Sequence, residues 1–86
     1  MLDLTPQALE DLIEIGRIEG RATALRILDV LDVLDPDDLP HGTRRVAFHV
    51  DAAGTAIVHL QLADPLDEIV LVIAGTVIMS VETINP

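Results

Sequence analysis

The chain has 86 residues, with 15 acidic against five basic side chains and a formal net charge of -10 at pH 7. This length predicts one domain over residues 1–86, and the lack of cysteine excludes disulfide-rich secreted folds and thiolate zinc sites, so we expect a cytoplasmic protein. The acidity and the single aromatic residue argue against direct binding to nucleic acid or to anionic membranes, and the 50% apolar content excludes intrinsic disorder.

Apolar residues recur at helical spacing over residues 6–34 and predict a helix there. Thr5 supplies an N-cap side chain, and Pro6 suits the first helical position. Gly16 and Gly20 fall on the apolar stripe, although each costs about 1 kcal/mol of helix stability relative to alanine. Glycine at these positions indicates close approach of another backbone, from a strand or a second helix. We expect one continuous helix, and a break at Gly16–Gly20 that gives a helical hairpin is the alternative.

Aspartates cluster at the end of this helix and in the following linker, residues 35–43. Three of them recur at every third position, so their carboxylates line one edge of the last helical turns. Acids at a helix C-terminus oppose the macrodipole at roughly 0.3–1 kcal/mol each, which favours a docking role toward a basic partner; a solvated face is the alternative. The linker lacks the residue order of a calcium-binding loop, so we expect no metal site. The predicted partner-binding residues, here called the acidic strip, are Asp29, Asp32, Asp35, Asp37 and Asp38.

Residues 44–63 alternate with a period of two and predict a β-hairpin. We expect one face of this hairpin on the core and the other in water. The apolar side of its first strand comprises Val46, Phe48 and Val50. His49 and His59 fall together on the outward face, close enough to share a metal ion or a proton. Zinc would need a third or fourth ligand that the pattern does not offer, so we expect two exposed histidines.

Residues 68–84 predict a second hairpin, because 69–81 form an uncharged run rich in β-branched residues. Gly75-Thr76 fits a type II′ turn at its centre. The register expected from that turn pairs Ala74 with Val77, Val72 with Met79 and Val70 with Val81. Both faces of the hairpin are apolar, which indicates that a second copy or another partner covers part of it. The residues expected at this homo-oligomer interface are Ile69, Leu71, Ile73 and Ile78, together with Gly16 and Gly20.

These elements together predict an α+β fold, with an N-terminal helix packed on a four-stranded antiparallel β-meander. The sequence has no cysteine, no lysine, no glycine-rich phosphate loop and no serine with an evident base, so we expect no enzyme activity and no cofactor. The acidity favours a small protein-binding module that docks on a basic surface, as inhibitors, antitoxins, immunity proteins and secretion chaperones do. The alternative is a structural subunit whose function is self-assembly into a homodimer or larger homo-oligomer.

Overall fold

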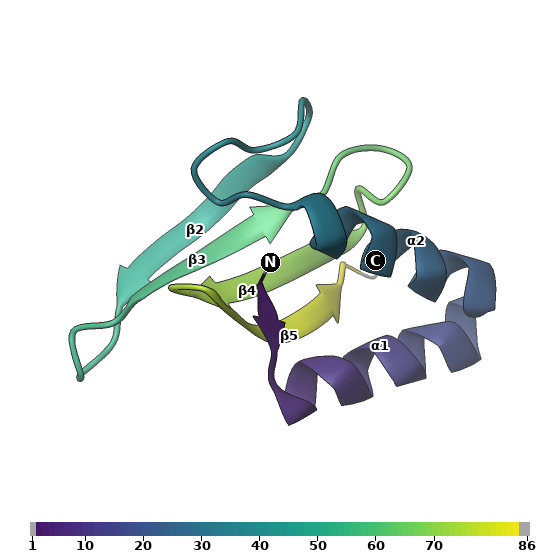
Figure 1. Cartoon of the computed structure of the whole chain (residues 1–86), viewed down its shortest axis with the longest axis horizontal. Helices are drawn as coiled ribbons and strands as arrows, with labels where there is room; N and C mark the ends of the chain where they lie inside the picture. Colours follow the sequence, from purple (N-terminus) through teal and green to yellow (C-terminus); the bar gives the residue numbers. More distant parts are fainter. Residues whose placement is uncertain (1, 85–86) are drawn as a thin grey trace.

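The computed structural model describes residues 2–84 as two helices and a five-stranded mixed sheet (Figure 1). The elements in chain order are β1 (Asp3–Leu4), α1 (Pro6–Glu19), α2 (Arg21–Val33), β2 (Arg44–Val50), β3 (Ala56–Gln61), β4 (Ile69–Ala74) and β5 (Val77–Thr83). The two helices lie together at one end of the molecule, and the β2–β3 hairpin extends away from them. The α+β class predicted from the sequence is therefore confirmed.

The sheet has the strand order β1-β5-β4-β3-β2, with β1 parallel to β5 and the other pairs antiparallel. The predicted four-stranded antiparallel meander is therefore wrong, because the residues before the first helix add a fifth, parallel strand. The Asp3 N–H donates to the Thr76 carbonyl oxygen at 2.9 Å, and the Thr5 N–H donates to the Ile78 carbonyl oxygen at 3.1 Å. Two residues are too few to show an alternating pattern, so β1 carries no signal in the sequence.

The helical region is a hairpin of two helices, so the expectation of one continuous helix is wrong and its alternative is correct. Gly20 separates α1 from α2 with φ +104° and ψ 150°, a backbone conformation that strongly favours glycine. A Cβ atom at Gly16 would lie 3.3 Å from the Cβ of Ala24, so the absent side chain lets the helices pack closely. These intrachain roles account for both glycines without the predicted homo-oligomer interface.

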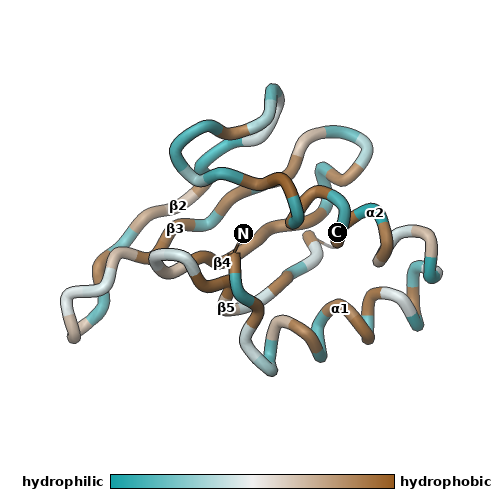
Figure 2. The backbone as a smooth tube through the Cα atoms, viewed as in Figure 1, coloured by the Kyte–Doolittle hydropathy of each residue, from teal (hydrophilic) through white to brown (hydrophobic). Residues whose placement is uncertain are grey.

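The core lies between the helical hairpin and one face of β3, β4 and β5. The four strand residues predicted at the homo-oligomer interface are only 0 to 4% exposed within one chain; they are Ile69, Leu71, Ile73 and Ile78. They cluster with buried residues of both helices, among them Leu12, Ile15, Ile27 and Leu31. Within one chain, the helical hairpin therefore covers apolar strand residues that one long helix would leave exposed. Figure 2 shows the hydrophobic run along β4, in the middle of the sheet.

The second hairpin turns at Gly75, where φ is 62°, and pairs Ala74 with Val77 as predicted. The two other predicted pairs are wrong, because a β-bulge at Met79 shifts the register by one position. The pairs beyond the bulge are Val72 with Ser80, Leu71 with Val81 and Val70 with Glu82. The Met79 carbonyl oxygen accepts a hydrogen bond from the Thr5 hydroxyl at 2.9 Å. The bulge is therefore held by a residue that is remote in the sequence.

The first hairpin forms from β2 and β3, but the predicted burial is wrong for β2. All seven β2 residues are exposed, including Phe48 at 64%. The helical layer lies near the β5 end of the strand order and does not reach β2 at the other end (Figure 1). His49 and His59 are neighbours, as predicted, with ring centroids 5.6 Å apart.

Candidate functional site

The open edge of β5 beside α1 is the candidate functional site. β1 pairs with only Val77 and Ile78, so the rest of β5 extends past the end of its parallel neighbour. Here α1 approaches the strand, and the Asp11 carboxylate accepts a hydrogen bond from the Val81 N–H at 3.0 Å. This contact uses one backbone donor of the open edge and fixes the helix beside the strand.

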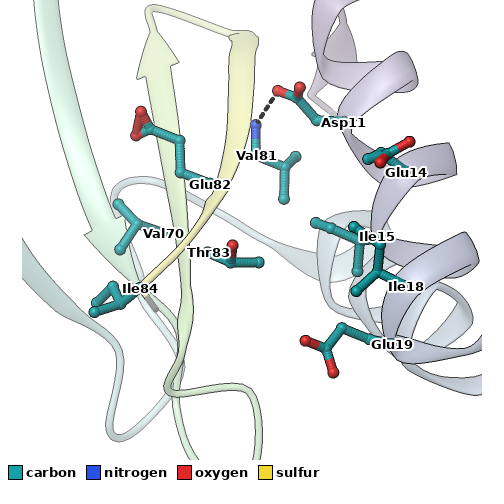
Figure 3. Close-up of a pocket in the computed structure, with 10 residues that line it drawn as sticks. All are labelled: Asp11, Glu14, Ile15, Ile18, Glu19, Val70, Val81, Glu82, Thr83 and Ile84. Carbon is teal, nitrogen blue, oxygen red and sulfur yellow. Dashed lines mark hydrogen bonds between the residues drawn. The ribbon is translucent and has the colours of Figure 1, made fainter. Parts of the chain in front are cut away.

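A groove with a volume of about 560 Å³ follows this edge, and we call it the acid groove. Figure 3 shows side chains of α1 on one side of β5 and Val70, Glu82 and Ile84 on its other side. The groove therefore runs along the strand edge between the helix and the outer face of the sheet. Its lining residues are Asp11, Glu14, Ile15, Ile18, Glu19, Val70, Val81, Glu82, Thr83 and Ile84.

The groove has an apolar floor and exposed apolar walls. Ile15 and Val81 are buried at 6% and 4% exposure, whereas Ile18 and Ile84 are 66% and 48% exposed. Ile15 and Ile18 share a face of α1 with Asp11, because helix residues three, four and seven positions apart line up. Apolar side chains are thus available to a ligand along both walls of the groove.

The groove is also strongly acidic, because four of its ten lining residues carry carboxylates and none is an arginine. Glu14 pairs with Arg17 of the same helix, and this hydrogen bond lowers the pKa of the Glu14 carboxyl below its ordinary value. Asp11 is engaged by Val81 and by the Gln7 amide, which donates at 2.9 Å. Within residues 2–84, the carboxylates of Glu19 and Glu82 form neither a hydrogen bond nor an ion pair with another side chain.

The acidic strip predicted from the sequence lies elsewhere. Its five aspartates are all exposed, two on α2 and three after it, and none lines the acid groove. Asp35 accepts a hydrogen bond from the Asp37 N–H at 2.9 Å, which closes a local turn. Asp37 borders a smaller hollow with Arg45 and apolar residues of β3 and β4. The structure therefore does not gather the strip around an apolar floor.

The sequence contains a local signal for one wall of the acid groove but none for the other. The spacing of Glu14, Ile15 and Ile18 on a helix is a local signal, and it puts acidic and apolar side chains on adjoining faces. Glu82 and Ile84 are about 65 residues away, and no local pattern relates them to α1. Their position beside the helix depends on the bulge at Met79.

The two neighbouring histidines do not form a larger cluster. Among the described residues, no group of three or more histidine, aspartate or glutamate side chains is placed to hold a metal ion. Neither helix is long and apolar enough to cross a membrane. Comparisons of the chain with protein-family models, curated proteins and solved structures each found no match. The chemistry of the acid groove is therefore the basis for a functional proposal.

Proposed function

We propose that this protein is a non-enzymatic binding module whose acid groove takes up a basic, partly apolar segment of another protein. The observation that carries the proposal is an apolar groove bordered by four carboxylates, with no positive charge in its lining. A segment with leucine-like side chains would bury Ile18 and Ile84, and its lysines or arginines would meet Glu19 and Glu82. Apolar contact would supply affinity, and charge would supply specificity and association rate.

The acid groove supports this function better than the acidic strip does. Exposed ion pairs contribute only about 0–1 kcal/mol each, so a row of solvated aspartates alone gives weak binding. Burial of apolar surface adds about 25 cal/mol per Å², and the groove combines that gain with charge. Inhibitors, antitoxins, immunity proteins and secretion chaperones are all compatible with this design. The absence of cysteine fits a cytoplasmic site of action.

The test is binding of a fluorescent synthetic peptide in which lysines flank leucines, followed by fluorescence polarisation. The double variant Glu19→Gln/Glu82→Gln should bind about tenfold more weakly, equivalent to about 1.4 kcal/mol. The matched control is Asp29→Asn/Asp32→Asn, which removes the same charge from the acidic strip and should change the affinity less than about twofold. If the control loses as much affinity as the groove variant, the peptide responds only to the net charge of the protein, and the acid groove is not the binding site.

The apolar part of the site has its own matched pair on α1. Ile18→Ser removes an exposed groove side chain, whereas Ile13→Ser removes one of nearly equal exposure, 65% against 66%, outside the groove lining. The first change should weaken peptide binding and the second should not, because only Ile18 would be covered by the peptide. Equal affinities of the two variants would contradict the apolar contribution.

A further inference from the structure

β2 is an edge strand whose outer backbone edge and side chains are exposed. It ends the sheet order β1-β5-β4-β3-β2, and among the described residues no strand lies on its outer side. All seven of its residues are exposed, and its three large apolar side chains, Val46, Phe48 and Val50, are 49, 64 and 57% exposed. Phe48 is also the only aromatic residue of the chain. An edge strand of this length and hydrophobicity is a site for pairing with another strand.

The opposite edge of the sheet is partly covered, which makes the contrast informative. There the edge strand β1 is only two residues long, and beyond it the Asp11 carboxylate of α1 accepts a hydrogen bond from the Val81 N–H of β5. On β2 the protective features stay at one end: a bulge between Arg45 and Ala47, and the two arginines that begin the strand. From Ala47 to Val50 the strand is regular and carries neither proline nor a fixed charge.

The free backbone groups and the bare side chains of β2 occur at the same residues. The Asp51 N–H donates inward to the Thr55 carbonyl oxygen, so by alternation those of Phe48 and Val50 point to the open edge. Phe48 lies opposite Val58, which lies opposite the buried Ile73, so Phe48 is on the face that carries the core. An added strand would therefore extend the sheet and its apolar face together.

The charge pattern of the hairpin identifies the partner strand. Residues 41–62 carry two arginines against one aspartate, in a chain of net charge -10, so this is a region where two copies can meet with little repulsion. Arg44 and Arg45 begin β2, and Asp51 follows its end. In an antiparallel pair centred on Phe48, Arg45 of each strand lies opposite Asp51 of the other, and the apolar residues meet at the centre. The strand is therefore complementary to itself.

We infer that two copies of this chain associate through β2, antiparallel and about a twofold axis, to form one continuous ten-stranded sheet. The interface leaves the acid groove free, because that groove lies beside β5 at the other side of the sheet. The inference therefore does not rest on the proposed function, and each can fail alone.

The first test is mass by light scattering after size exclusion, over a concentration series. The wild-type chain should move toward twice its monomer mass of 9.3 kDa. Phe48→Lys and Val50→Lys should each remain monomeric at all concentrations, because a lysine at the centre of an edge opposes pairing. Ile13→Lys, at a position as exposed as Phe48, should dimerise like wild type. Circular dichroism of each variant verifies that it is folded.

The second test is independent of charge and uses the absence of native cysteine. A Phe48→Cys variant should give a covalent dimer with a short bis-maleimide, and an Ile13→Cys variant should not, because only position 48 is close to its copy. A wild-type monomer at every concentration would overturn the inference. It is equally overturned by a dimer that persists in both β2 lysine variants. A dimer that is lost in Ile13→Lys and is cross-linked in Ile13→Cys would also overturn it, because that result would assign the interface to the helices.

Discussion

Thr5 joins three elements through one residue. Its hydroxyl accepts a hydrogen bond from the Ala8 N–H at 3.1 Å, which caps α1, and donates to the Met79 carbonyl oxygen of the bulge. Its backbone N–H donates to the Ile78 carbonyl oxygen and continues the contact between β1 and β5. The N-cap was predictable from Thr5-Pro6 alone, whereas the bond to the bulge was not. The start of the helix and the register of the last strand therefore depend on the same side chain.

Removal of the Thr5 hydroxyl should destabilise the protein by about 1–2 kcal/mol, since both the helix cap and the bond to the bulge are lost. Thr5→Ala tests this loss, and Thr5→Ser is the matched control because it retains the hydroxyl. Urea unfolding followed by circular dichroism measures the free energy of unfolding of each. Equal stability of the alanine and serine variants would mean that the hydroxyl does not hold the bulge.

The reversal of the chain between α1 and α2 is the decisive event among the elements. It turns a 28-residue helical region into a layer of two helices that covers the sheet. The hydrogen bond from the Val81 N–H to the Asp11 carboxylate holds α1 alongside the open edge of β5. Gly20 adopts the required positive φ, and Gly16 allows the close approach of Ala24. The acid groove is lined by α1 and by strands β4 and β5, and no residue of α2 takes part in it.

Gly20→Ala should cost about 1–3 kcal/mol of stability, because a Cβ atom is strained at φ +104° and ψ 150° although no neighbour lies within 4 Å of it. The neighbouring Glu19→Ala, within the helix, should change stability by less than about 0.5 kcal/mol. The measurement is again the urea midpoint of the two variants. An unaffected Gly20→Ala protein would indicate that α1 and α2 can join in another way.

The whole molecule has more large apolar side chains than one chain encloses. Chains of this size bury only about 60% of the surface of the unfolded state, so exposure of some apolar residues is expected. Some of the exposed ones lie at the two proposed surfaces: Ile18 and Ile84 at the acid groove, and Val46, Phe48 and Val50 on β2. Others lie on the helices, where Leu9, Ile13 and Leu28 border a separate apolar hollow between α1 and α2. We propose the acid groove for a basic partner and β2 for a second copy.

The residues first expected between subunits should behave as core. Ile73→Asp should unfold the chain, because the side chain is 3% exposed and an unpaired carboxylate cannot be buried there. Ile13→Asp, on the exposed side of α1, should leave the fold intact. Circular dichroism and size exclusion distinguish these states. A folded, soluble monomer from Ile73→Asp would restore the β4–β5 face as an intersubunit surface.

Several features of the fold were available from local sequence. Thr5-Pro6 marks the start of α1, the change of period after Gly42 marks the start of the strands, and Gly75 marks the last turn. Each depends on conformational preferences of a few adjacent residues, so no distant contact is needed to recognise it. The excess of carboxylates, and hence the expectation of a basic partner, is likewise a property of composition.

The tertiary structure alone decided how these pieces act together. The direction of the chain after Gly20, the bulge at Met79 and the pairing of β1 with β5 all depend on contacts between residues far apart in the sequence. The same is true of the acid groove, whose walls come from α1 and from the end of β5. Local pattern specifies which face of an element is apolar, but long-range packing determines what covers that face. For that reason the isoleucines of β4 and β5 became core, and β2 became the bare edge.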